Sequence, residues 1–168
     1  YSNLDELSDS LFSNFISLQR DFPDSHTGWY LKTKVSILFS KNDILSLRND
    51  TDVFTGGANS NYIIELTNFD LKTGKILLLE DIIENESLAK ISDVAENIFK
   101  KTNNIKTSYK DNGYWFENDT FQLTDNFTIS DSGIVFIYNL YEIAPRSTGI
   151  TELFIPKESI TDFVKIFK

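Results

Sequence analysis

Few residues of this chain could carry catalytic chemistry. His26 is the only histidine among 168 residues, and it stands in the polar segment 21–28, where we expect an exposed loop. A single histidine excludes a zinc site built from several histidines, and its loop position argues against a catalytic triad. The chain has no cysteine, which excludes thiolate metal sites, cysteine nucleophiles and disulfides. We therefore expect no cofactor and no metal site.

Closely spaced carboxylates are the remaining catalytic candidates. Three such pairs are Asp81 with Glu84, Asp50 with Asp52, and Glu117 with Asp119. Two carboxyl groups hydrolyse a glycosidic bond when they face each other across a cleft at roughly 5–9 Å. All three pairs lie in acidic, turn-rich stretches that are typical of solvated surface. We expect a protein that is not an enzyme, with a glycan-acting enzyme that uses surface carboxylates as the alternative.

The charge of the chain limits its partners. With 25 acidic and 16 basic residues the net charge is −9, which argues against nucleic-acid binding because phosphate contacts need a positive face. The acidic surface is either simply solvated or attractive to a basic partner. No apolar run approaches the ~20 residues of a membrane span, and no signal-peptide pattern is present. The chain begins at Tyr1 and lacks methionine, so we expect a mature or trimmed fragment.

Two segments have the composition of a recognition surface. The first is the aromatic and polar loop 139–149, which follows the apolar residues 134–138 at a strand end, where scaffolds often present binding groups. The second is the stretch 55–61, whose two adjacent glycines allow positive φ or a close backbone approach. The predicted binding residues are Tyr141, Glu142, Pro145, Arg146, Gly56, Gly57 and Asn59. Tyr141 and Arg146 are the expected anchors, because Tyr and Arg dominate binding hot spots. The alternative is that both segments only connect strands.

Hydrophobic periodicity predicts the elements that position these segments. Residues 4–22 form an amphipathic helix with apolar residues at steps of three and four, and Asn3 with Glu6 predicts a capping box at its start. Alternation predicts strands at 29–39, from 44 to about 48 with an irregular continuation to 54, and at 62–69. Four consecutive apolar residues predict a strand at 76–79 that is buried on both faces.

The second half of the chain follows the same rules. An apolar stripe predicts a helix over residues 86–101. Short strands are expected at 121–123, 126–129, 134–138 and 150–155, followed by a short C-terminal amphipathic helix after Pro156. The cluster Tyr114-Trp115-Phe116 is interpreted as core packing. Because strands follow strands, we expect an α+β fold with mostly antiparallel sheets, an N-terminal helix, a central amphipathic helix and a short C-terminal helix.

Three passages together resemble a known family. They are Thr-Gly-Gly-Ala-Asn at 55–59, Asn-Phe-Asp-Leu-Lys-Thr-Gly-Lys at 68–75 running on to Leu-Glu-Asp at 79–81, and Gly-Ile-Val-Phe at 133–136 with Tyr-Glu-Ile-Ala-Pro at 141–145 and Gly149. Their order and spacing resemble the bacterial extracytoplasmic domain of unknown function at the C-terminus of RsiV-type anti-sigma factors. The same domain accompanies PdaC-type peptidoglycan deacetylases and occurs in Bacteroidetes lipoproteins. The resemblance divides the chain into a companion subdomain of a helix and a β-hairpin at 1–54 and the RsiV-like α+β domain at 55–168, together one compact unit.

The resemblance implies an extracytoplasmic, cell-envelope location, with a lipid anchor in the full-length precursor as an option. RsiV-type members bind lysozyme, and in the deacetylase the chemistry belongs to a separate catalytic domain that is absent here. The chain departs from the family pattern at Asn59, where a histidine commonly follows Gly-Gly-Ala, and at Arg146, where an aromatic residue is usual. We therefore expect a non-catalytic domain that binds a lysozyme-like basic protein or peptidoglycan. A glycan-acting accessory module and a purely structural lipoprotein module are the alternatives.

Overall fold

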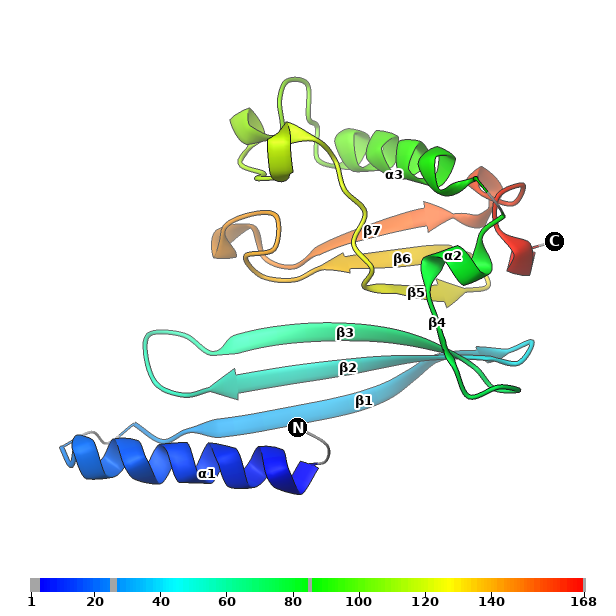
Figure 1. The fold of residues 1–168 in the computed structure, drawn as a ribbon. Helices are drawn as coiled ribbons and strands as arrows, with labels where there is room; N and C mark the ends of the chain where they lie inside the picture. The colour runs from blue at the N-terminus through cyan, green and yellow to red at the C-terminus, as the bar shows by residue number, and fades with distance from the viewer. Residues whose placement is uncertain (1–3, 25–26, 85, 168) are drawn as a thin grey trace. The chain divides into compact units, whose positions relative to one another are not determined.

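The computed structural model describes residues 4–24, 27–84 and 86–167 (Figure 1). Asn3 and His26 lie outside these ranges. Two antiparallel sheets are present, with strand orders β1-β2-β3-β4 and β5-β6-β7. The strands are β1 (Tyr30–Lys41), β2 (Ile44–Phe54), β3 (Asn61–Asp70), β4 (Ile76–Leu77), β5 (Phe127–Ser130), β6 (Gly133–Tyr138) and β7 (Thr151–Pro156), and the α-helices are α1 (Leu4–Asp21), α2 (Leu79–Ile82) and α3 (Leu88–Thr102). The predicted α+β class is confirmed.

The chain divides into two compact units. The first contains residues 1–33 and 51–62, and the second contains residues 34–50 and 63–168. Strands β1 and β2 each contribute residues to both units. Within the first unit the ring of Phe15 on α1 packs 5.7 Å from that of Trp29, and Tyr30 stacks on Phe54 at 5.8 Å.

The core of the second unit lies between α3 and the three-stranded sheet. Strand β6 is central, pairing with β5 from Phe127↔Phe136 to Ser130↔Gly133 and with β7 from Gly133↔Pro156 to Tyr138↔Thr151. Helix α3 packs against β7, as Figure 1 shows. Its buried residues recur every four positions, at Ile91, Ala95 and Phe99, which is the spacing of one helical face.

Aromatic rings surround Phe99, which is fully buried. Five rings lie 5.0–6.3 Å from it, centroid to centroid: Tyr109, Tyr114, Phe116, Phe121 and Tyr138. All five contacts are tilted or edge-to-face, which aromatic quadrupoles favour over face-to-face stacking. We call this group the Phe99 cluster. It holds the irregular segment 105–121 against the helix and the sheet.

Asparagine side chains join β3 to the three-stranded sheet. Asn126 accepts a hydrogen bond from the N–H of Leu66 (2.7 Å) and donates to the carbonyl of Ile64 (2.8 Å). Asn139 accepts from the N–H of Ile64 (2.8 Å) and donates to its carbonyl (3.0 Å). Strand β4 pairs with β3 only at Asn68↔Leu77 and Phe69↔Ile76. The amide side chains therefore satisfy backbone groups of β3 beyond the reach of β4.

Three predicted elements differ from the structure. Strand β4 has only two residues and is not buried, since Ile76 is 57% exposed and Leu77 is half-buried. The reason is that the chain turns into α2 at Leu79. Residues 121–123 form no strand, because Phe121 packs in the Phe99 cluster instead of pairing with another strand. The C-terminal helix forms as two 3-10 turns, Lys157–Ser159 and Lys165–Phe167.

Candidate functional site

The binding residues predicted in the loop 139–149 all lie in its part 141–149, which we call the loop 141–149. Glu142 fixes the start of this loop. The Glu142 carboxylate accepts a hydrogen bond from the backbone N–H of Asn139 (Oε2···N 2.7 Å). In return the N–H of Glu142 donates to the carbonyl of Asn139 (3.1 Å). This reciprocal pair closes a tight turn after β6, so one role of Glu142 is to hold the loop backbone. Because the side chain of Asn139 is bonded to Ile64, the turn is anchored to β3 as well.

Trp115 holds the middle of the same loop. Its backbone N–H donates to the carbonyl of Ile143 (2.9 Å), and its indole Nε1–H donates to the carbonyl of Glu142 (3.1 Å). Ile143 and Ala144 are buried beneath. Tyr141 remains 58% exposed and has a φ of 65°, an uncommon conformation for a bulky residue that the surrounding bonds maintain. The loop is therefore a preformed platform that projects an aromatic ring into solvent.

The end of the loop is equally regular. Residues Arg146–Thr148 form a 3-10 turn after Pro145, and the N–H of Gly149 donates to the carbonyl of Arg146 (3.0 Å). Gly149 has a φ of 81°, which favours glycine. Pro145 and Arg146 are half-buried.

A groove lies beside the loop, and we call it the Trp115 groove. Its volume is about 250 Å³, and its lining residues are Trp115, Phe116, Glu117, Gln122, Leu123, Thr124, Tyr138, Glu142 and Ile143. Trp115 is 49% exposed, and Glu117, Gln122 and Glu142 are exposed as well. An indole face next to carboxylates and an amide can receive either a cationic side chain or a sugar ring.

Tyr138 forms the sheltered end of this groove. Its O–H donates to the carbonyl of Gln122 (2.7 Å), which ties the irregular segment before β5 to the end of β6. Burial raises the pKa of Tyr138 well above its ordinary value, and the nearby charge of Glu142 adds to the effect. The phenol is therefore neutral at physiological pH and acts as a hydrogen-bond donor.

The Gly-Gly turn at residues 56–59 belongs to the first unit and is described by itself. Gly56 and Gly57 have φ values of 98° and 99°, so both use the conformations that glycine permits. A Cβ atom built on Gly56 would lie 3.7 Å from Nε1 of Trp29. That indole nitrogen is buried and has no hydrogen-bond partner among the described residues. A buried donor without a partner requires an explanation, and an acceptor from a ligand or a water would supply one.

The structure thus groups the predicted binding residues into two sets. Tyr141, Glu142, Pro145 and Arg146 share one loop of the second unit, while Gly56, Gly57 and Asn59 share one turn of the first unit.

Sequence reasoning missed Trp115, which was assigned to the core with its neighbours. The structure buries Tyr114 and Phe116 and exposes the residue between them. In an extended segment alternate side chains point to opposite sides, and this period of two was the available signal.

The carboxylate pairs have local partners. Asp50 forms an ion pair with Arg48 (2.8 Å), Asp81 accepts from the N–H of Leu78 (2.9 Å), and Asp119 accepts from the N–H of Lys110 (2.9 Å). Glu117 and Glu142 both line the Trp115 groove, but neither is sheltered from water. A glycosidase acid needs an environment that keeps it protonated. Within residues 4–24, 27–84 and 86–167, no three His, Asp or Glu side chains gather as metal ligands.

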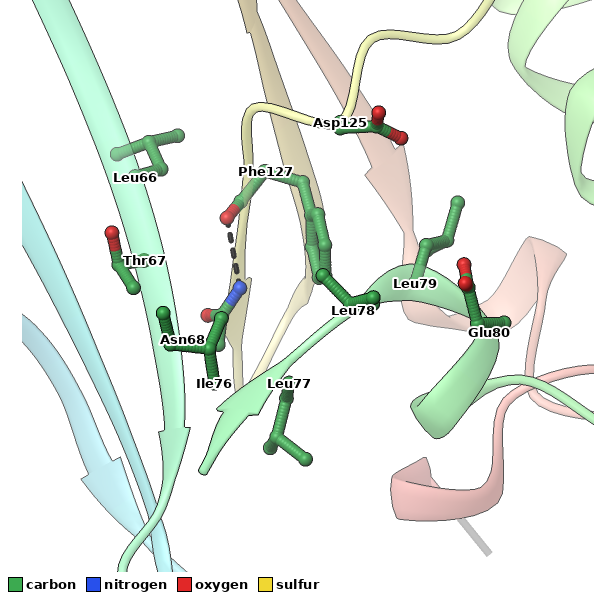
Figure 2. Close-up of a pocket in the computed structure, with 10 residues that line it drawn as sticks. All are labelled: Leu66, Thr67, Asn68, Ile76, Leu77, Leu78, Leu79, Glu80, Asp125 and Phe127. Carbon is green, nitrogen blue, oxygen red and sulfur yellow. Dashed lines mark hydrogen bonds between the residues drawn. The ribbon is translucent and has the colours of Figure 1, made fainter. Parts of the chain in front are cut away.

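A second pocket, shown in Figure 2, lies where β4 separates from β3. Its volume is about 260 Å³, and half of its lining residues are aliphatic, including Leu66, Leu77 and Leu78. The side chain of Asn68 donates to the carbonyl of Phe127 (2.9 Å, dashed in Figure 2) and accepts from the hydroxyl of Ser46 (2.6 Å). Its buried amide is therefore satisfied, and the charged residues of the lining, Glu80 and Asp125, are both exposed.

The chain is similar to known proteins in part of its sequence and in its fold. Residues 80–158 match the model of DUF3298, a family described as a protein of unknown function. The matched region contains the Trp115 groove and the loop 141–149. No match was found among curated proteins. None of the helices in the described ranges combines the length and apolar character needed to cross a membrane.

Two crystal structures of DUF3298 family proteins share the fold. A member from Bacteroides fragilis NCTC 9343 is 24% identical with a TM-score of 0.75, and the alignment covers 93% of this chain and 62% of that one. A protein from Pseudomonas aeruginosa PAO1 is 23% identical with a TM-score of 0.68, covering 89% of this chain and 69% of that one. The chain therefore spans less than two thirds of the length of the Bacteroides protein. At these identities the similarity concerns the fold alone.

Proposed function

We propose that this chain is a non-catalytic cell-envelope domain that binds a basic protein, such as a lysozyme, at the Trp115 groove and the loop 141–149. The observation that carries the proposal is that the exposed Trp115 lines the same groove as the exposed acidic residues Glu117 and Glu142. The ring face attracts a Lys or Arg side chain by about 0.5–2 kcal/mol, and the carboxylates pair with its charge. The net charge of −9 steers a basic partner toward the domain.

The preformed loop supports a binding role. Tyr141 projects from a backbone that Asn139, Glu142 and Trp115 hold in place, so little conformational entropy is lost when a partner docks. The envelope location and the lysozyme-like ligand rest on the resemblance to RsiV-type and PdaC-type proteins. That resemblance is carried by residues such as Glu142, Pro145 and Gly149.

Isothermal titration calorimetry with lysozyme tests the proposal. The informative variants are Glu117→Gln, which removes one charge, and Tyr141→Asn, which removes the ring while an Asn tolerates the left-handed backbone. Each should weaken binding at least about fivefold, near 1 kcal/mol, and wild-type affinity should fall as salt rises. Glu158→Gln, an exposed acid outside the groove, is the matched control. Absence of heat at micromolar concentrations, or equal affinity in all variants, would reject the proposal.

Peptidoglycan fragments are the second candidate ligand, favoured by the exposed indole face and the neighbouring Gln122. A neutral sugar stacked on Trp115 would bind with little dependence on salt, in contrast to lysozyme. The same titration with soluble peptidoglycan fragments at two salt concentrations therefore separates the two ligands. If Tyr141→Asn leaves both titrations unchanged, the loop has only the structural role of closing the sheet.

Catalysis has its own test, because Glu117 and Glu142 share one groove. We expect no release of reducing sugars when the domain is incubated with peptidoglycan. Release that Glu117→Gln abolishes would instead establish a glycan-acting enzyme.

A further inference from the structure

We propose that a separate pocket of the second unit binds a small monocarboxylate with an alkyl or aromatic tail. We call it the Lys157 pocket. It has a volume of about 290 Å³ and lies between the end of β1, the β5–β6 turn and the C-terminal 3-10 turns. It shares no residue with the Trp115 groove, so its ligand is independent of the function proposed above.

The Lys157 pocket has apolar and polar lining residues in equal number. The apolar ones are Phe39, Ile44, Ile129, Ile166 and Phe167. Ile44 and Ile129 are only 7% and 1% exposed, so they form a fixed floor that belongs to the core. The volume is at the lower limit for small-molecule sites, which restricts the tail to a short alkyl chain or one aromatic ring.

The charges around this pocket favour an anion. Lys41 and Asp131 neutralise each other through an ion pair of 2.8 Å that joins the end of β1 to the β5–β6 turn. Lys157 has its Nζ 5.4 Å above the ring of Phe167, and it forms no ion pair with a described residue. The lining therefore carries one uncompensated positive charge in a chain whose net charge is −9.

A neutral donor accompanies this cation. Asn42, in the turn after β1, also lines the pocket, and its side-chain amide makes no hydrogen bond to another described residue. An ammonium and an amide N–H₂ are both donors that a carboxylate accepts from. The combination of an apolar floor with donors at the polar side matches an amphipathic anion. Lys157 would repel a cationic ligand. A purely polar anion would make no apolar contact with Ile44 and Ile129.

Two-dimensional ¹H–¹⁵N NMR titrations test the assignment with octanoate, octanol and octylamine, which share a tail and differ in charge. Octanoate should give saturable shifts at the amides of Ile129, Ser130 and Phe167, and it should bind at least about tenfold more tightly than octylamine. Lys157→Gln should weaken octanoate binding about tenfold and leave octanol unchanged. Lys106→Gln, which removes an exposed lysine outside the pocket, is the matched control.

Three results would overturn the proposal: shifts that do not saturate, equal binding of octanoate and octylamine, or full octanoate affinity in Lys157→Gln. If Lys157→Gln folds poorly, the comparison of octanoate, octanol and octylamine on the wild-type chain still tests the proposal. Lysozyme binding should be unchanged in Lys157→Gln, which keeps this test distinct from that of the Trp115 groove.

Discussion

Strands β6 and β1 show that apolar residues at alternate strand positions can have opposite burial. In β6, Ile134, Phe136 and Tyr138 are at most 1% exposed. In β1, Val35 and Ile37 occupy equivalent alternate positions and are 62% and 68% exposed. Strand β6 is the central strand of its sheet and contributes to the Phe99 cluster, whereas β1 is an outer strand. Alternation therefore identifies the apolar face of a strand, and tertiary packing decides whether that face is covered.

The largest predicted effect concerns Phe99, whose ring packs against Tyr138 of β6. Phe99→Ala should destabilise the second unit by about 3–5 kcal/mol, because it removes the ring on which the surrounding aromatics pack. Urea denaturation followed by circular dichroism measures the change. Leu88→Ala, on the same helix but at a 49% exposed position, should cost far less and serves as control. Equal losses in both variants would mean that the Phe99 cluster does not stabilise the sheet.

The second prediction concerns the asparagines that join β3 to the other sheet. Asn126→Ala leaves the N–H of Leu66 without its partner and removes one of the two hydrogen bonds to the carbonyl of Ile64, so we expect a loss of about 1–3 kcal/mol. Hydrogen exchange should show the amide of Leu66 losing protection in this variant. Asp125→Ala changes the exposed neighbour and should leave exchange unaltered. A Leu66 amide that stays protected in Asn126→Ala would show that β3 has another support at this edge.

The sequence predicted the regular elements well where one rule determined them. The stripe of Ile91, Ala95 and Phe99 located α3, and the apolar run 134–138 located β6. It failed where distant residues decide the outcome. Alternation located a strand that includes Val35 and Ile37 but not their exposure to solvent, and β4 was expected to be longer. In each case the missing information was which other element packs nearby.

The site was predicted only in part for the same reason. The loop 141–149 could be located from composition, because a polar and aromatic stretch followed a buried strand. Trp115 could not be assigned to that loop, since its two hydrogen bonds to residues 142 and 143 span 27 and 28 positions in sequence. Asn126 and Asn139 look like ordinary loop asparagines in the sequence, and only their bonds to β3 reveal their role.

The third prediction concerns alkaline pH. Burial raises the pKa of Tyr138 and Tyr109, and for Tyr109 the hydrogen bond to Glu96 adds to the effect. The folded state thus retains protons that the unfolded chain releases near pH 10.0. Stability is complete below that pH and should decrease as pH rises above it. Tyr138→Phe should flatten this decrease in urea titrations between neutral and alkaline pH, and Tyr141→Phe, at an exposed ring, should not. Identical slopes in the two variants would contradict the assignment.

The smallest effect is predicted for β1. Ile37→Thr should change the free energy of unfolding by no more than about 0.5 kcal/mol, because the side chain is already in water and threonine suits a strand. Ile134→Thr makes the same chemical change at a fully buried position, where it removes a packed methyl group and buries a hydroxyl. Its cost should be several times larger in the same urea measurement. If Ile37→Thr were as costly as Ile134→Thr, the exposed face of β1 would have to be covered in solution. Concentration-dependent unfolding of the wild-type chain would then identify a second copy as the cover.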